Sequence, residues 1–134
     1  MNHFDLDFSG WTPKDFKYTS TREDWAERLG ISAKTLQRYE TEILYRDISK
    51  MPHNSSIRLT QAFYWRNRRN RTKLDYYQKF ILWIIQKLSF GEAYANQKLS
   101  YDQIQDWFNG IHEVTGKERI LMLSPPLVRK MLDV

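Results

Sequence analysis

The chain has 134 residues, of which 41% are hydrophobic and 15% aromatic, and it carries a net charge of +5 with no cysteine. This composition excludes a disordered chain, a disulfide scaffold and any thiolate site, and the length suits one domain. With only five glycines and four prolines, and little alternation of polar and apolar residues, the sequence predicts an all-α single helical domain over residues 1–134.

Helix-start patterns recur along the first half of the chain. Thr12-Pro13-Lys14-Asp15 and Ser20-Thr21-Arg22-Glu23 read as capping boxes, in which the first residue caps a helix and the acid bonds back to it. Ser32 is a third cap. Asn54-Ser55-Ser56 can cap a helix that runs to about Arg69.

The strongest helical pattern spans Leu74–Leu88, where apolar residues recur at steps of three and four. Thr72-Lys73-Leu74-Asp75 is a capping-box pattern at its start, and Gly91 lies just past its end. Two roles fit this wide apolar surface, and they are compatible with one another: the central core helix of the domain, and the interface of a homodimer.

The C-terminal region carries weaker signals. Ser100-Tyr101-Asp102-Gln103 predicts the start of a further helix, which Asn109-Gly110 ends. Pro126 can begin a last short helix that ends near Leu132. Residues 92–134 contain no functional signal.

Residues Arg22–Thr41 meet the requirements of two short helices that cross steeply. Ala26 is small enough for close approach of the helices, Gly30 tolerates a left-handed turn, and Ser32 can cap the second helix. The apolar residues of a shared core are in register: Trp25, Leu29, Ile31, Leu36 and Tyr39. The spacing predicts a helix-turn-helix within about residues 20–45, followed by a packed C-terminal helical region.

The stretch Leu29–Glu40, with the sequence LGISAKTLQRYE, resembles the recognition-helix region of the bacterial helix-turn-helix family, and most of all MerR-type regulators and phage excisionases. The likeness covers about 20 residues, and no glycine between Gly30 and Gly91 marks the wing that follows in MerR-type proteins. The resemblance implies that the helix from Ala33 enters the major groove of duplex DNA.

The exposed positions of that helix divide by chemistry. Gln37 can bond two edge atoms of adenine, and Arg38 two acceptors of guanine. The expected base contacts are Lys34, Gln37 and Arg38. The expected contacts to the DNA backbone near the two helix starts are Thr21, Arg22, Ser32 and Thr41. We expect Glu40 and Glu42 to face away, because their charges would repel phosphate.

The charge excess lies in one segment. Residues 48–74 contain seven Lys/Arg and no acid, whereas residues 1–47 carry a net −2 and residues 75–134 a net 0. An acid-free basic segment is typical of a surface that contacts nucleic acid, and arginine suits phosphate because it can donate paired hydrogen bonds. The expected phosphate contacts here are Arg66, Arg68, Arg69, Arg71 and Lys73.

No pattern indicates an enzyme. His112-Glu113 lacks the second histidine of a zinc-protease motif, and no phosphate-binding glycine loop or serine-nucleophile motif occurs. We expect no catalytic residue, no metal ligand and no cofactor. The longest apolar run, Phe80–Ile85, is too short for a bilayer, which needs roughly 20 residues. The acidic Met1–Asp7 is unlike a secretion signal, so we expect a cytoplasmic protein without membrane contact.

Together these features predict a sequence-specific duplex-DNA-binding protein, either a small transcriptional regulator or an accessory factor of a mobile element, associated with the nucleoid. The layout is a helix-turn-helix at about 20–45, a basic segment at 48–74, and core or oligomerisation helices at 74–134. Two alternatives stay open. The helix-turn-helix could be a docking corner for a protein partner that also contacts Tyr76 or Trp83, or Trp65 and the arginines could bind single-stranded nucleic acid or RNA.

Overall fold

The computed structural model describes residues 10–44, 73–91, 98–104 and 125–132. Within these ranges the chain is mostly helical, and its two strands, β1 (Ser20–Thr21) and β2 (Lys73–Leu74), are two residues each. The all-α single domain predicted from the sequence is therefore confirmed. The predicted helix between Asn54 and Arg69 and the predicted helix end at Asn109-Gly110 lie outside the described residues.

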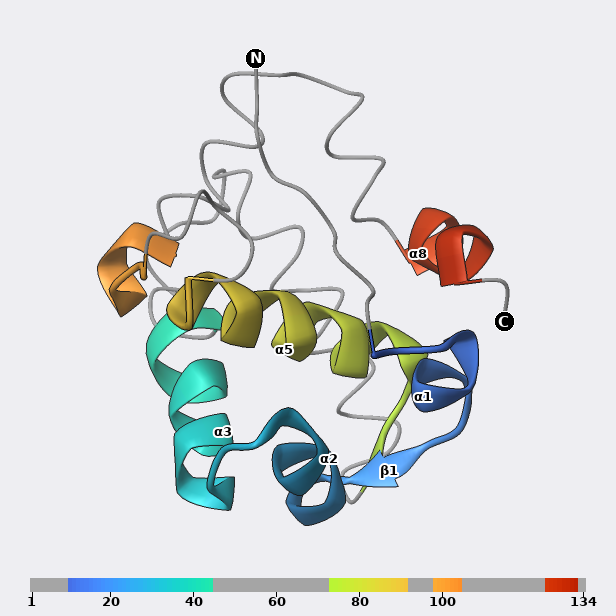
Figure 1. The fold of residues 1–134 in the computed structure, drawn as a ribbon, viewed down its shortest axis with the longest axis horizontal. Helices are drawn as coiled ribbons and strands as arrows, with labels where there is room; N and C mark the ends of the chain where they lie inside the picture. Colours follow the sequence, from blue (N-terminus) through green and yellow to red (C-terminus); the bar gives the residue numbers. More distant parts are fainter. Residues whose placement is uncertain (1–9, 45–72, 92–97, 105–124, 133–134) are drawn as a thin grey trace.

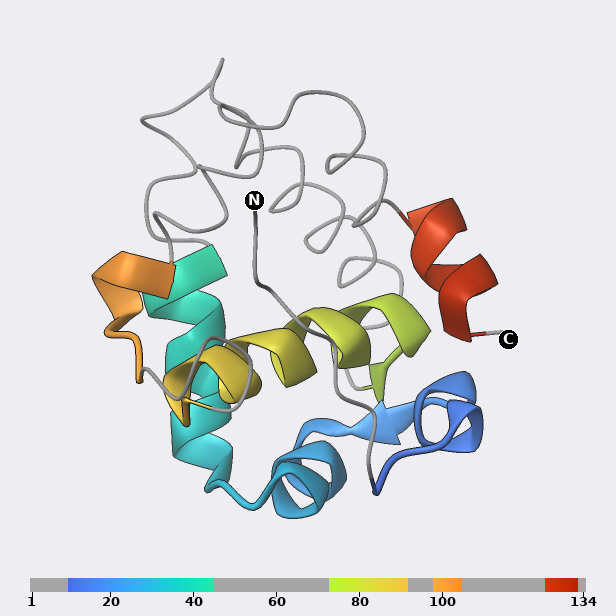
Figure 2. The ribbon, with the colours of Figure 1, turned by 45° about the horizontal axis from the view of Figure 1, so that its top comes forward.

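The helices are arranged around α5 (Tyr76–Ser89), as Figures 1 and 2 show. Three N-terminal helices contact it along its length: α1 (Pro13–Lys17), α2 (Arg22–Leu29) and α3 (Ala33–Tyr39). A π-helical turn, η1 (Glu40–Leu44), continues α3. The C-terminal α8 (Pro125–Leu132) contacts α5 and α1, and it lies on the side of α5 that faces away from α2.

Helix α5 is buried around its whole circumference. Every residue from Tyr77 to Gln86 is buried, including the polar Gln78 and Lys79. A helix of this kind belongs in the core of a domain. Its burial confirms the core role predicted for Leu74–Leu88, and it leaves the described part of this helix without an exposed apolar stripe for the homodimer interface that was the other prediction.

The short sheet shifts two helix starts from their predicted positions. β1 and β2 pair antiparallel, with Ser20 opposite Leu74 and Thr21 opposite Lys73. Because the strand extends through Thr21, α2 begins at Arg22 and its cap is Thr21 rather than Ser20. The Thr21 hydroxyl accepts a hydrogen bond from the Asp24 amide at 3.1 Å. Pairing also occupies Lys73 and Leu74, so the predicted start of the long helix at Leu74 is wrong.

The cap of α5 is Asp75 rather than Thr72. Its carboxylate accepts a hydrogen bond from the Gln78 amide at 3.0 Å, and the Gln78 side chain bonds back to the Asp75 amide at 3.0 Å. At the other end, Gly91 has φ of 76°, which confirms it as the glycine that ends the helix. The helix is thus fixed at both termini, but it begins two residues later than the apolar pattern predicts.

Three other predicted helix starts are confirmed. The Thr12 amide donates to the Asp15 carboxylate at 2.7 Å at the start of α1. The hydroxyl of Ser100 accepts from the Gln103 amide at 3.2 Å and begins a helical turn at 101–104. The last helix starts at Pro125, one residue before the predicted Pro126.

Contacts between aromatic rings pack α1 and α2 against α5. The Trp25 ring meets Trp11 and Phe16 edge-on, with centroids 5.6 Å apart in both pairs, and the Trp25 indole N–H donates to the Lys79 carbonyl at 3.2 Å. Phe16 in turn contacts Trp83 at 5.6 Å. Edge-to-face pairs of this kind stabilise the fold beyond the burial of their apolar area, and their preferred geometry favours one arrangement of the helices. Helix α2 therefore has a fixed position on the core.

Candidate nucleic-acid interface

Helices α2 and α3 meet in a tight turn, and together with η1 they form the α2–α3 corner, residues 22–44. Gly30 follows α2 with φ of 77°, in the left-handed region, and the Gly30 and Ile31 amides bond back to the Glu27 and Ala26 carbonyls at 3.0 Å. The Ser32 hydroxyl then caps α3 by accepting from the Thr35 amide at 3.0 Å. Figure 1 shows the two helices crossing steeply. The turn glycine and the cap predicted from the sequence are both confirmed.

Replacing Gly30 with alanine is expected to lower the free energy of unfolding by about 1–2 kcal/mol, because a Cβ disfavours the left-handed conformation. Nothing lies within 4 Å of an added Cβ at this position, so the cost is one of backbone conformation and not of steric overlap. Gly30→Asn is the matched variant and should cost less, since asparagine tolerates positive φ. Urea unfolding measures both, and an equal cost for the two variants would contradict this cause.

An ion pair joins the start of α2 to the residue that follows α3. Arg22, the first residue of α2, donates from Nε and Nη2 to the two carboxylate oxygens of Glu40, each at 2.9 Å. Glu40 directly follows α3 and is 6% exposed. A paired arrangement of two donors and two acceptors fixes direction as well as distance. Arg22, which the sequence offers as a DNA-backbone contact, is therefore engaged in setting the geometry of the corner.

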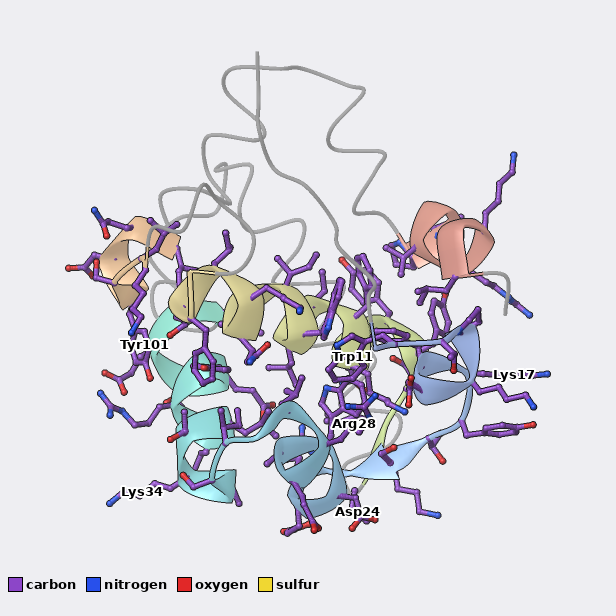
Figure 3. All side chains as sticks on the ribbon, viewed as in Figure 1. Trp11, Lys17, Asp24, Arg28, Lys34 and Tyr101 are labelled. Atoms are coloured by element: carbon purple, nitrogen blue, oxygen red, sulfur yellow. The ribbon has the colours of Figure 1, made fainter. Side chains whose placement is uncertain are left out.

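The outer face of α3, together with the start of η1 that continues it, is polar and exposed. Lys34, Gln37, Arg38 and Thr41 are spaced three and four residues apart, so they share one face, and all four are exposed. Lys34 extends away from the molecule in Figure 3. The opposite face is buried through Leu36 and Tyr39, as the sequence predicts. The structure thus brings the predicted base-reading residues together on one face of a helix whose other face is packed in the core.

Arg38 has a carboxylate partner on that face. Its Nε donates to Glu42 at 2.6 Å, and this hydrogen bond raises the pKa of the Arg38 guanidinium further. Glu40 is buried, as expected of a residue that faces away. The same expectation for Glu42 is wrong, because Glu42 lies one helical turn after Arg38 and on the same exposed face.

The sheet brings together two predicted backbone contacts from distant segments. Thr21, the cap of α2, lies opposite Lys73, the last basic residue of the segment 48–74. That segment therefore ends beside the start of the α2–α3 corner. The remaining predicted phosphate contacts of the segment lie outside the described residues: Arg66, Arg68, Arg69 and Arg71.

The corner itself is not basic. Residues 22–44 contain four cations and five acids, a net charge of −1. Three of the cations pair with carboxylates: Arg22 with Glu40, Arg28 with Asp15, and Arg38 with Glu42. Lys34 has no carboxylate within ion-pair distance in the described ranges. The excess positive charge of the chain therefore lies in the segment 48–74 and not in the corner.

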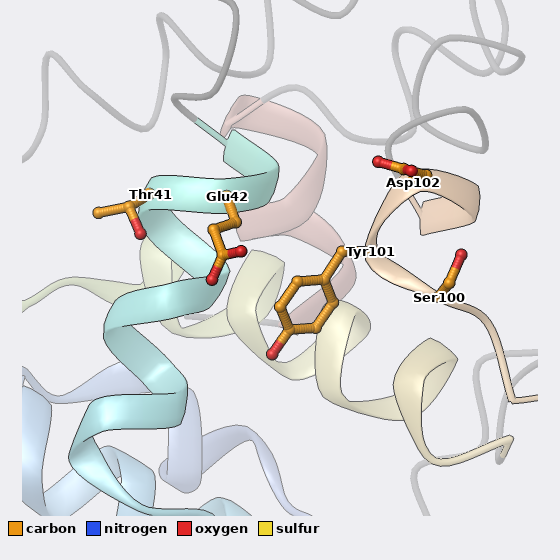
Figure 4. A pocket seen from close by; sticks show the side chains of 5 residues that line it. All are labelled: Thr41, Glu42, Ser100, Tyr101 and Asp102. Atoms are coloured by element: carbon orange, nitrogen blue, oxygen red, sulfur yellow. The ribbon is translucent and has the colours of Figure 1, made fainter.

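A groove adjoins the end of α3 and was not predicted. It has a volume of about 600 Å³ and lies between η1 and the segment 98–104. Figure 4 shows its lining residues: Thr41, Glu42, Ser100, Tyr101 and Asp102. Glu42 and Tyr101 point toward one another across it. Two carboxylates and three hydroxyls line this groove, which makes it an acidic and polar neighbour of the Arg38 side chain.

Neither a metal site nor a membrane-spanning helix is found among the described residues. Across the described ranges, no three His, Asp or Glu side chains gather closely enough to hold a metal ion. In the same ranges, every helix is too short or too polar to cross a membrane. No family model, curated protein or solved structure matches the chain.

Proposed function

We propose that this protein binds duplex DNA sequence-specifically, with α3 in the major groove, as a small transcriptional regulator or an accessory factor of a mobile element. The observation that carries the proposal is the outer face of α3. It presents Lys34, Gln37 and Arg38, with Thr41 following on η1, and the helix is packed against the core by Leu36 and Tyr39. Side chains that match base edges discriminate well when the helix that carries them is fixed. Such a protein would associate with the nucleoid.

In this proposal one part of the chain attracts the DNA phosphates, and another part recognises the bases. The corner has a net charge of −1 and supplies the base contacts, whereas the segment 48–74 has a net charge of +7 and neutralises phosphates. The pairing of Thr21 with Lys73 supports this division, because it joins the end of the basic segment to the start of α2.

Replacing Gln37 or Arg38 with alanine is expected to weaken binding to the preferred duplex by about 5- to 100-fold and to relax the preference at one base pair each. Each substitution removes two hydrogen bonds to a base edge and leaves the contacts to phosphates in place. Fluorescence anisotropy on selected and scrambled duplexes measures the effect. Lys14→Ala on α1 is the control, since Lys14 is an exposed cation away from the corner. Unchanged site preference in both variants would remove these two residues from the interface.

Docking of a protein partner on the same corner is a second candidate. The observation that favours it is the exposed acidic face of α2, formed by Glu23, Asp24 and Glu27, which suits a basic partner and not phosphate. Of the two aromatic residues expected to assist such docking, Trp83 is fully buried, whereas Tyr76 is half-buried and its hydroxyl donates to the Pro125 carbonyl. Loss of binding to a partner on Asp24→Lys, with no duplex binding by the parent protein, would favour docking.

A preference for single strands remains a separate prediction. It depends on Trp65 and the neighbouring arginines, which lie outside the described residues. Competition between single-stranded and duplex probes of the same sequence decides between the two, since stacking on unpaired bases requires an open strand.

A further inference from the structure

The Arg38 guanidinium is held from two sides by residues of different segments. Its Nε donates to Glu42 at 2.6 Å, and its central carbon lies 5.2 Å from the centre of the Tyr101 ring. The side chains of Arg38 and Glu42 remain about half exposed, at 54% and 47%. No described residue accepts a hydrogen bond from the two terminal nitrogens of Arg38. The Nε of Arg38 is thus occupied by Glu42, whereas its two terminal nitrogens are available to donate hydrogen bonds to a ligand.

Tyr101 is itself fixed by the core. Its ring meets the buried Tyr39 ring nearly perpendicularly, with centroids 5.9 Å apart. The helical turn that carries it is capped by Ser100 and tied to the end of α5 by the hydrogen bond from the Leu99 amide to the Leu88 carbonyl at 3.0 Å. A flexible arginine that lies against such a ring has fewer conformations to lose on binding.

Arginine can offer two parallel donors in two ways, either Nε with one terminal nitrogen or both terminal nitrogens together. Because Glu42 takes Nε, only the second way is open to Arg38 without breaking the ion pair. Guanine presents two acceptors, O6 and N7, on its major-groove edge. Adenine presents one acceptor and one donor there, so the second N–H of the arginine would have no acceptor.

We propose that Arg38 reads a guanine through its two terminal nitrogens, and that Glu42 and Tyr101 are positioning residues that preset this geometry. The inference rests on the proposed function, since it requires α3 to lie in the major groove. It gives Glu42 a role that its charge alone would not suggest, and it gives Tyr101 a role in a region without any functional signal in the sequence.

The test compares Glu42→Gln with Glu23→Gln. Both substitutions remove one exposed negative charge, but Glu23 lies on α2 and makes no ion pair with Arg38. A selected duplex first identifies the base pair whose preference disappears in Arg38→Ala. Affinities are then measured for duplexes with guanine, adenine or 7-deazaguanine at that position, the last of which lacks only the N7 acceptor.

We expect Glu42→Gln to lower the preference for guanine over adenine by about three- to tenfold, while Glu23→Gln leaves it unchanged. Both variants should bind a random duplex slightly more tightly than the parent, because each removes one repulsive charge. The parent should lose affinity on 7-deazaguanine, and Glu42→Gln should lose less. For Tyr101, the leucine variant should lower the preference and the phenylalanine variant should retain it, since only the ring is required.

Different results would contradict DNA binding and the positioning role of Glu42 and Tyr101. If the parent selects no duplex sequence, the DNA proposal itself fails. If the parent selects a site and Glu42→Gln keeps the full guanine preference, DNA binding stands and the positioning role is wrong. A selected site without guanine at the position read by Arg38 also overturns the inference. Circular dichroism and urea unfolding verify that each variant is folded.

Discussion

Replacing Arg66, Arg68, Arg69 and Arg71 together by glutamine is expected to weaken binding to every duplex by about 100-fold or more at low salt, whatever its sequence. The four residues supply most of the positive charge of the segment 48–74, and the α2–α3 corner cannot replace it, since residues 22–44 carry a net −1. Each phosphate contact that is lost should also reduce the magnitude of the slope of log K against log salt by about 0.9, so four contacts reduce it by about 3–4.

The matched control removes four cations elsewhere. Lys14 and Lys17 on α1 and Arg129 and Lys130 on α8 are exposed, and their replacement by glutamine changes the net charge by the same amount. We expect this control to lower affinity only a few-fold, through the weaker overall field. Equal losses in the two variants would mean that total charge, and not contact by the basic segment, determines affinity.

Replacing Lys79 with methionine is expected to stabilise the protein at pH 7 by about 1–3 kcal/mol. Lys79 lies on the central helix α5 and is 2% exposed. Its ammonium donates to the Tyr18 carbonyl at 2.8 Å and lies 4.5 Å from the centre of the Trp25 ring. Burial lowers the pKa of this ammonium from 10.5 to about 8, although attraction by Asp15 acts in the opposite direction. The charged form is thus disfavoured in the folded protein.

The same shift predicts how stability depends on pH. Between about pH 8 and pH 10.5 the unfolded chain keeps a proton on Lys79 that the folded chain has released, so the contribution of this group to the free energy of unfolding rises with pH in that window. Below about pH 8 both states are charged, and the full penalty is present. The methionine variant has no such titration. The difference in stability between variant and parent should therefore be largest at pH 7 and shrink as the pH approaches 10.5.

Urea unfolding at pH 7, 9 and 10 measures this difference, and comparison with the parent cancels the titration of other groups. Lys14→Met is the control, because it removes an exposed lysine charge from α1. A methionine variant that is less stable than the parent at pH 7 would show that the hydrogen bond to Tyr18 and the contact with Trp25 outweigh the cost of burying the charge.

The α2–α3 corner could be predicted because its requirements are local. A left-handed residue, a helix cap and a set of apolar residues at helical spacing all lie within twenty residues of one another, and Gly30, Ser32 and Leu36 meet them in the structure. The exposed face of α3 follows from the same spacing, since residues opposite a buried stripe must face outward.

The starts of α2 and α5 could not be predicted to the residue because a distant pairing determines them. Strands of two residues carry no periodic signal, and Ser20 and Thr21 are equally good caps when considered alone. The pairing of β1 with β2 keeps the chain extended through Thr21, so that α2 begins at Arg22 and Thr21 is its cap. Similarly, nothing in the local pattern indicates that Lys73 and Leu74 extend as a strand before Asp75 caps α5.

The contacts of Arg22 and Arg38 illustrate a second limit of prediction from sequence. Glu42 lies four residues after Arg38, and this spacing by itself favours an ion pair, so the expectation that Glu42 faces away gave too much weight to its charge. The pairing of Arg22 with Glu40 joins residues 18 apart, and the contact of Arg38 with Tyr101 joins still more distant segments. These contacts depend on how α2, α3 and the 101–104 turn pack, which no short pattern encodes.

The most direct test of the DNA-binding proposal is the fluorescence-anisotropy titration of the intact protein on a random duplex pool at several salt concentrations, with the bound sequences read out. We predict a steep salt dependence together with an enriched motif that loses a guanine preference in Arg38→Ala. Absence of binding at low salt, or binding without any enriched sequence, would contradict recognition of duplex DNA by α3.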